Sequence, residues 1–295
     1  MIKKFFYAGL ILFIAASCSN ELNNQVINDD ALVPVRVHVD GFDVSQEDFP
    51  NTRAATAIAD YNDINAVTVA FYSGSTETCK VTQLKDDNTT YSTFGNFDLS
   101  LPLGSYTMVV VAYTTKDGSP FVLTSPTEAA YTGAHAYETF AKTQAVNITS
   151  TNAVNINATL ERIVAKLQVV STDGKTADVT NVRMTFSAGS KSFNPTTGLA
   201  SSNTGFANVV SNSAAVGTSS RSLSFLFLTT DEQTMDVTIE TLDADGKTVF
   251  SKTVSNVTFK RNRMTKLTGA MYTNPGVSGT FQIETTWLTD NVVNF

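Results

Sequence analysis

The chain has 295 residues, a formal net charge of −7 and 16% charged residues, which is well below the roughly 25% of an average globular protein. A chain of this length has room for two domains of ordinary size, each with its own core. The acidic balance, without any basic cluster, argues against nucleic acid as a partner. The abundance of Thr, Ser, Asn, Val and Ala is typical of β-rich extracellular proteins.

The first predicted element is an export signal. A pair of lysines near the start precedes an apolar run over 5–16, which is shorter than the roughly 20 residues of a membrane-spanning helix. Three small residues then stand directly before Cys18, as they do at the cleavage site of a lipoprotein signal. The pattern predicts a signal peptide over 1–17, lipidation of Cys18 and a polar tether over 18–32. An ordinary cleaved signal peptide is the alternative.

The next predicted element is a strand with one apolar face, over 33–42. Arg36 and His38 point to its other face, and Pro34 restricts it to an edge or to the first residues of a strand. Burial of the four valines on that face stabilises the strand by about 6 kcal/mol, at about 1.5 kcal/mol each. The conformational entropy lost on ordering the strand is not subtracted from this figure. Residues 43–60 have no core face and are expected to form an exposed loop. The apolar face of the strand consists of Val33, Val35, Val37 and Val39.

Further strands recur along the chain with turn signals between them. Asp-Gly pairs at 117–118, 173–174 and 245–246 favour tight turns, in which a residue with positive φ is needed. Residues 126–143 are the best candidate for a short helix, with a loop as the alternative. Apolar alternation predicts strands over 64–72, 78–84, 94–101, 106–113, 140–156, 160–170, 179–187, 222–228, 235–242, 248–259 and 264–272.

This pattern predicts an all-β fold of two tandem β-sandwich domains with Greek-key-type connections. A weak internal repeat agrees with two related domains. Residues 109–121 and 237–250 each contain a predicted strand, an Asp-Gly turn and then the first apolar residues of a further segment. The N-terminal domain is expected over 33–157 and the C-terminal domain over 158–295. The last strand, or tail, is expected over 281–295.

The sequence has few candidates for catalysis or metal binding. His38 and His135 have no partner at a ligand spacing, so we expect no metal site. The motifs of nucleophilic hydrolases, phosphate-binding loops and zinc proteases are absent from the sequence. We therefore expect neither enzyme activity nor a cofactor. Nine tyrosines and one tryptophan permit a glycan-binding platform but do not point to it. We expect Trp287 to be a core or interface residue, with a sugar-binding role as the alternative.

Several motifs, taken in order, resemble the fimbrillin family, the subunits of type V pili made by Bacteroides-like bacteria. They are the lipoprotein leader, the Val-rich first strand, Arg53 before Ala54, LPLGSY at 101–106, LERIVAKL at 160–167 and KRNRM at 260–264. The resemblance covers nearly the whole chain. It implies transthyretin-like sandwiches, export as an outer-membrane lipoprotein precursor, and a place in a cell-surface fimbrium.

The resemblance also implies a mechanism. An Arg- or Lys-directed protease would cut between Arg53 and Ala54, which releases the strand over 33–42 together with lipidated Cys18. A strand of the next subunit would then fill the groove by β-strand addition, so that subunits join head to tail. The donor would be the C-terminal tail, whose alternative is the last strand of its own sandwich. The candidate donor residues are Phe281, Ile283, Thr285, Trp287, Val292, Val293 and Phe295.

The resemblance makes other pilus subunits the expected partners, with a host protein or glycan as a further candidate. Within the family, the alternative role is a membrane-retained anchor or a tip subunit. Outside the family, the alternative is a surface glycan-binding lipoprotein. In each case the lipid would tie the precursor to the outer membrane, and no nucleic acid is expected to bind.

Overall fold

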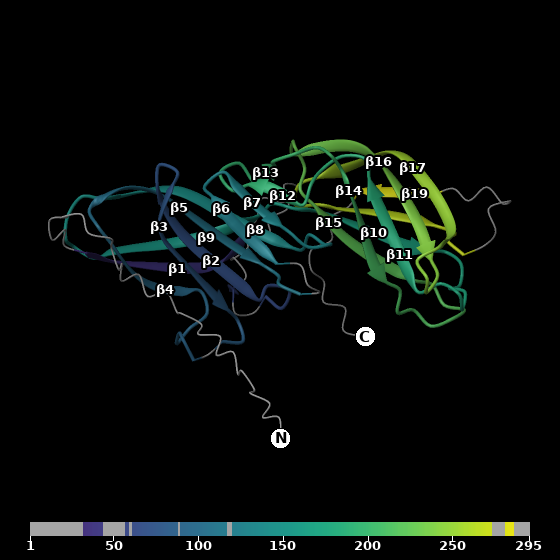
Figure 1. The fold of residues 1–295 in the computed structure, drawn as a ribbon, viewed down its shortest axis with the longest axis horizontal. Coiled ribbons are helices and arrows are strands. Elements are labelled where there is room, and N and C mark those ends of the chain that lie inside the picture. Colours follow the sequence, from purple (N-terminus) through teal and green to yellow (C-terminus); the bar gives the residue numbers. More distant parts are fainter. Residues whose placement is uncertain are drawn as a thin grey trace, which may run out of the picture.

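The structure is a computed structural model that describes residues 32–43, 57–58, 61–87, 89–116, 120–272 and 281–285. These residues form strands and no α-helix, so the all-β prediction is confirmed. Within these described ranges there is no helix that could span a membrane. Figure 1 shows the strands of the first half of the chain at one end of the molecule and those of the second half at the other.

The first half contributes seven strands to one sheet: β1 (Val33–Asp43), β2 (Ala66–Ser73), β3 (Thr76–Leu84), β4 (Asn96–Leu101), β5 (Gly104–Tyr113), β8 (Thr139–Ile148) and β9 (Val154–Arg162). Their order is β3-β2-β5-β8-β9-β1-β4. β8 and β9 pair only at Phe140 with Arg162 and at Ala141 with Glu161, so the sheet bends there. The layers β3-β2-β5-β8 and β9-β1-β4 enclose one apolar core between them.

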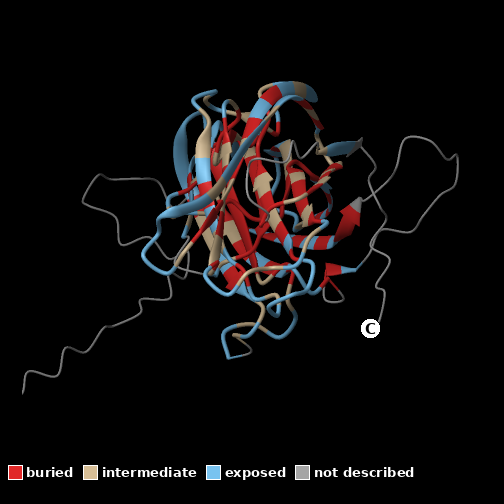
Figure 2. Cartoon of the chain, turned by 90° about the vertical axis from the view of Figure 1, so that its right-hand side faces the viewer, coloured by how far each residue is buried: buried red, intermediate tan, exposed pale blue. Residues whose placement is uncertain are grey.

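The second half forms two four-stranded sheets from β10 (Ala165–Ser171), β11 (Asn181–Phe186), β14 (Phe206–Ser211), β15 (Arg221–Leu226), β16 (Glu232–Leu242), β17 (Thr248–Lys260), β18 (Met264–Gly269) and β19 (Gln282–Thr285). The sheets are β15-β10-β18-β19 and β14-β11-β16-β17, and a second apolar core lies between them. Figure 2 shows buried residues along the inner strands and exposed residues in the turns and on the outer faces.

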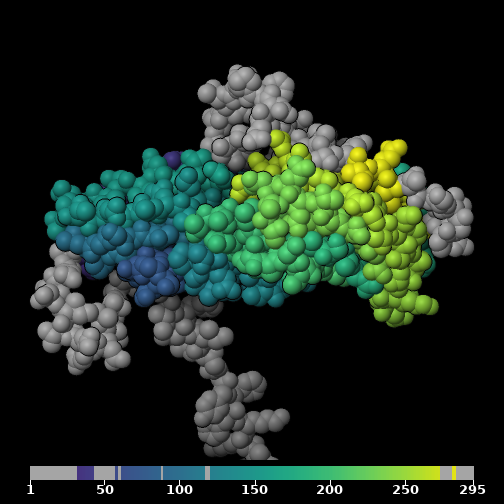
Figure 3. All heavy atoms as spheres, turned by 90° about the horizontal axis from the view of Figure 1, so that it is seen from above, coloured from purple at the N-terminus to yellow at the C-terminus, as the bar shows by residue number. Residues whose placement is uncertain are grey.

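A small sheet joins the two halves. It consists of β6 (Phe121–Ser125), β7 (Glu128–Tyr131), β12 (Ser192–Asn194) and β13 (Leu199–Ala200), in the order β13-β12-β7-β6. Its central pair, β7 with β12, connects the first half to the second. A third core lies under it, in which the ring centroids of Phe193 and Phe227 are 4.5 Å apart. Seen from above, the two halves abut along the long axis (Figure 3).

The structure corrects the predicted elements at two places. Residues 126–143, the candidate helix, contain β7, a loop and the start of β8, because these segments complete sheets whose ladders pair their backbone groups. The strand predicted over 160–170 is interrupted at 163–164, where the chain passes from the first sheet to the second. The boundary expected after Asn157 therefore falls inside β9. Five strands were not expected, namely β6, β7, β12, β13 and β14.

Phe227→Ala removes a ring from the core between the halves, so we expect it to lower the free energy of unfolding by about 3–5 kcal/mol. It should also increase hydrogen exchange in β6 and β7 of the other half, which pack over this core. Phe259→Ala is the matched control, because its ring is equally buried but lies in the second core. Equal exchange in β6 and β7 of both variants would show that this core does not couple the halves.

Candidate functional site

The first strand lies inside its sheet and has a hydrogen-bonded neighbour on each side. β1 pairs antiparallel with β4 over 33–38 and parallel with β9 over 35–43. Pro34 is the second residue of the strand, a position where the missing N–H is tolerated. Because both edges of β1 are paired, its removal would leave unpaired backbone groups on β4 and on β9.

The inner face of β1 closes the first core. The register with β9 shifts between Val39 and Gly41, and Gly41 has a φ of 153° that other residues rarely adopt. This bulge inserts one residue and turns Phe42 into the core. The inward side chains are at most 1% exposed, namely Val33, Val35, Val37, Val39 and Phe42. The inner face is therefore a fully buried apolar ridge that ends in an aromatic ring.

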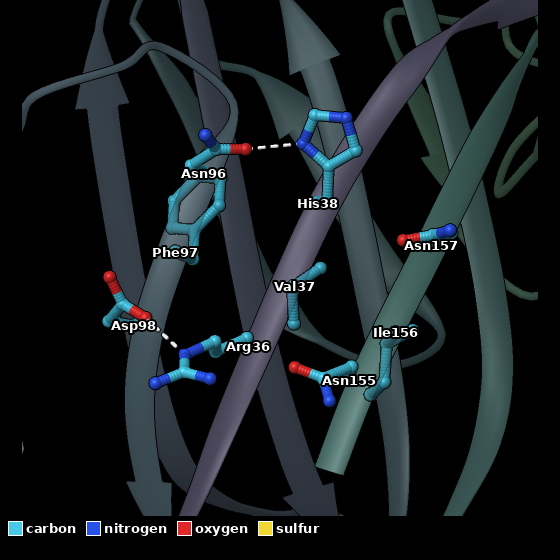
Figure 4. Close-up of a pocket in the computed structure, with 9 residues that line it drawn as sticks. All are labelled: Arg36, Val37, His38, Asn96, Phe97, Asp98, Asn155, Ile156 and Asn157. Carbon is cyan, nitrogen blue, oxygen red and sulfur yellow. Dashed lines mark hydrogen bonds and ion pairs between the residues drawn. The ribbon is translucent and has the colours of Figure 1, made fainter. Parts of the chain in front are cut away.

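The outer face of β1 is polar and lines a hollow of about 430 Å³. Arg36 Nε lies 3.2 Å from Asp98 Oδ1 of β4, and the His38 ring contacts the Asn96 side chain on the same strand (Figure 4). The side chains of Arg36 and Asp98 are 63% and 85% exposed, so this pair adds little stability. The inner face, rather than the outer one, holds the strand. On the other side the hollow is lined by Asn155 and Asn157 of β9.

A buried ion pair lies beside the end of β1. Arg162 Nε is 2.6 Å from Glu138 Oε1, and the two side chains are 0% and 7% exposed. Arg162 Nη2 donates to the hydroxyl of Tyr61 at 2.6 Å, and this hydroxyl donates to Glu138 Oε1 at 2.8 Å. Burial raises the pKa of the Glu138 carboxyl, while the Arg162 charge and the Tyr61 hydroxyl oppose this rise. The three side chains thus lie in contact with one another in the interior of the protein.

The same arginine reaches the second half of the molecule. Arg162 Nη1 donates to Asn262 Oδ1 at 3.1 Å. Asn262 has a φ of 57°, lies between β17 and β18, and donates its backbone N–H to the carbonyl of Val164 at 2.9 Å. Two segments that carry the family resemblance, 160–167 and 260–264, therefore meet at the junction. The sequence analysis did not predict this network. Arg162 does occupy an inward position in the alternation of β9, and a charged residue at an inward position indicates a buried partner.

Phe42 connects β1 to this network. Its ring centroid lies 4.1 Å from that of Phe140 and 5.0 Å from that of Tyr61. The guanidinium carbon of Arg162 lies over the Phe140 ring, 4.9 Å from its centroid. Such aromatic and cation–π contacts stabilise a site beyond the burial of apolar area. The end of β1 therefore touches the groups that shield the buried charges.

The C-terminal candidates are only partly described. β19 pairs antiparallel with β18 and forms the edge of its sheet. Phe281 packs partly buried against the second core, while Ile283 is 44% exposed. Residues 281–285, which end with Thr285, thus lie in their own sandwich and not beside β1. The remaining predicted residues lie outside the described part of the chain, namely Cys18, Arg53, Ala54, Trp287, Val292, Val293 and Phe295.

The two histidines and further residues of metal-binding types lie within the described part of the chain. Among them, no group of three or more His, Cys, Asp or Glu side chains could hold a metal ion. His38 contacts Asn96, and His135 contacts Asn208 of the second half. Around β1 the described residues provide backbone pairing and apolar burial.

Comparison with known proteins adds a family and a fold. The profile of a Family of unknown function (DUF6562) matches residues 41–293. A candidate adhesin from Bacteroides ovatus has a TM-score of 0.53 over 88% of this chain and 97% of that chain, at 10% identity. The fimbrial anchor protein Mfa2 from Porphyromonas gingivalis has a TM-score of 0.49 over 87% of this chain and 98% of that chain, also at 10% identity. No curated protein matches the sequence.

At these identities the likeness is one of fold. The chain shares the fold of the Bacteroides ovatus candidate adhesin over most of the length of both chains. The all-β fold that the resemblance implied is therefore confirmed.

Val37→Ala, on the inner face of β1, is expected to lower the free energy of unfolding by about 2 kcal/mol, because it removes buried methyl groups and leaves a cavity. Arg36→Ala is the neighbouring control on the outer face and should change it by no more than about 0.5 kcal/mol. Chemical denaturation of the uncut chain measures both values. Similar losses for the two variants would contradict the conclusion that the inner face holds the strand.

Arg162→Met leaves the Glu138 carboxylate buried without its cation, so we expect a loss of about 3–5 kcal/mol of stability at neutral pH. Because burial raises the pKa of Glu138, the carboxyl becomes neutral as the pH falls through that value. The loss should therefore shrink at acidic pH and be largest above the folded-state pKa. Adding Glu138→Gln to the variant should recover stability at neutral pH. Denaturation curves across pH test this, and a loss independent of pH would disagree.

Proposed function

The chain belongs to the Family of unknown function (DUF6562), and we propose that it is a structural and adhesive subunit of a cell-surface pilus. The observation that carries this proposal is the position of β1 between β4 and β9. A strand that is paired on both edges, buried on one face and close to the N-terminal end of the chain leaves a groove when it is removed. Another strand can fill such a groove by backbone pairing.

The site of the proposed cut agrees with this role. β1 ends at Asp43, and the chain returns to the first core at Ile58 and Tyr61, which are 4% and 8% exposed. A cut between Arg53 and Ala54 therefore separates β1 from a remainder whose own contacts with the core persist. The same cut removes Cys18, so a subunit that was exported as an outer-membrane lipoprotein becomes free to enter the fimbrium.

The energetics require a replacement for β1. Four valines and one phenylalanine of β1 are buried, and each contributes about 1.5–3 kcal/mol. Cleavage after Arg53 removes none of these contacts, so β1 leaves only as a competing strand takes over its ladder and its apolar positions. When that strand comes from another subunit, the contact does not close on itself and a filament grows.

The C-terminal tail is the strand that we assign to this exchange. Among the described strands, β19 has a partner on one edge only, through 282–285, and Ile283 is exposed. Releasing this short edge strand breaks far fewer contacts than releasing β1. The tail over 281–295 also carries apolar residues at alternating positions, as a strand entering a half-buried slot requires.

The glycan-binding alternative finds no comparable support at the hollow beside β1. Flat aromatic side chains would be expected to face a sugar there. The aromatic residue in the lining is Phe97, whose side chain is only 3% exposed and belongs to the first core. The remaining lining residues are polar or aliphatic.

Treatment of the purified precursor with a trypsin-like protease is expected to produce a new N-terminus at Ala54 and a ladder of multimers in a gel without boiling. Arg53→Gln is the matched control and should remain uncut at this position and monomeric. Deletion of 286–295 should allow the cut but abolish the ladder. Cleavage at another site, or a cut chain with an intact tail that stays monomeric, would contradict the proposal.

Mass spectrometry of the cell-surface form tests the role within the fibre. A polymerised subunit should begin at Ala54 and carry no lipid. A surface form that retains a diacylglyceryl group on Cys18 would identify a membrane-retained anchor instead.

A further inference from the structure

We propose that the space occupied by Phe42 is the specificity subsite of the groove, and that it takes an aromatic side chain from the strand that replaces β1. This inference rests on the proposed function, because it concerns the strand that enters when β1 leaves. The occupant is the C-terminal tail of a second copy of the chain. That tail carries aromatic side chains on the face with its alternating apolar residues, among them Phe295.

The rest of the groove cannot define the register of an incoming strand. Its four inward positions are held by identical residues, two apart along the chain: Val33, Val35, Val37 and Val39. A strand shifted by two residues would again place aliphatic side chains in these positions, since side chains alternate with a period of two. A shift of this kind costs little along the valine ridge. Only a position with different walls can select one register.

The position of Phe42 has such walls. It follows the bulge at Gly41, so it is offset by one residue from the alternation of the valines. Its neighbours are the rings of Phe140 and Tyr61, at centroid distances of 4.1 and 5.0 Å. The interplanar angle to Tyr61 is 71°, an edge-to-face arrangement that aromatic pairs favour. An aliphatic side chain could fill part of this volume but not reproduce these contacts.

The subsite also protects the buried charges. Phe140 carries the Arg162 guanidinium over its ring, and Tyr61 donates to Glu138. A ring at position 42 keeps water away from Phe140 and Tyr61, and the ion pair behind them stays in an apolar surrounding, where its attraction is strong. An empty subsite would admit water next to these groups. An incoming strand that lacks the aromatic side chain therefore loses more binding free energy than one that lacks a valine.

The walls remain after the proposed cut. Tyr61, Phe140 and Arg162 all follow Arg53 in the sequence, so the mature chain keeps the subsite while it loses Phe42. The space between Tyr61 and Phe140 that Phe42 occupied therefore fits an aromatic ring. The incoming tail must supply a ring of its own to close the core.

Peptide exchange into the cut full-length chain tests the subsite. A fluorescent peptide of residues 33–43 is offered in its native form and as the variants Phe42→Ala, Phe42→Leu and Val35→Ala. We expect Phe42→Ala to weaken binding about 100-fold and Val35→Ala about 10-fold, with Phe42→Leu between them. The inference is overturned if the native peptide exchanges and Phe42→Ala binds as well as Val35→Ala. If no peptide exchanges, not even the native one, the proposed function falls and the subsite with it.

A second arm tests the occupant. A peptide of residues 281–295 should exchange into the cut chain, and Phe295→Ala should weaken its binding about as much as Phe42→Ala weakens that of the first peptide. Phe281→Ala is the matched control, because it removes the same ring at the opposite end of the peptide. Loss with Phe281→Ala but not with Phe295→Ala would overturn the assignment of Phe295.

Discussion

The pairing of β1 on both of its edges is the constraint on which the first half of the molecule depends. β4 has its ladder with β1, and the layer β9-β1-β4 exists only because β1 lies in its middle. The same strand contributes five fully buried side chains to the core. Backbone groups that are buried without a partner are costly, so this layer always requires a strand in that place. Exchange of one strand for another is compatible with this constraint, whereas simple loss is not.

The junction between the halves turns this local constraint into a property of the whole chain. The contacts run from Phe42 to Phe140 and Tyr61, then to Arg162, and from Arg162 to Asn262 of the second half. Beside this path, β7 pairs with β12 and a shared core lies beneath them. The halves are therefore joined by hydrogen bonds and packed rings.

Much of the fold was predictable from local patterns. The valine alternation over 33–39 predicted a strand with one buried face, and the Asp-Gly pairs predicted turns. The failures have physical causes. Residues 126–143 have a helical composition, yet they lie where two sheets need partners, and tertiary pairing overrides propensity. Arg162 was read as part of a motif, and its burial depends on Glu138 and Tyr61, which are distant in sequence.

The sequence by itself determined the fold class, the buried face of the first strand and the polarity of its outer face, because each follows from a periodicity that the backbone imposes on neighbouring residues. Only the tertiary structure decided that β1 lies between β4 and β9, that a bulge directs Phe42 into an aromatic pocket, and that Arg162 links the two halves. These features depend on segments that are far apart along the chain. Their proximity results from the packing of whole sheets, and no local pattern encodes it.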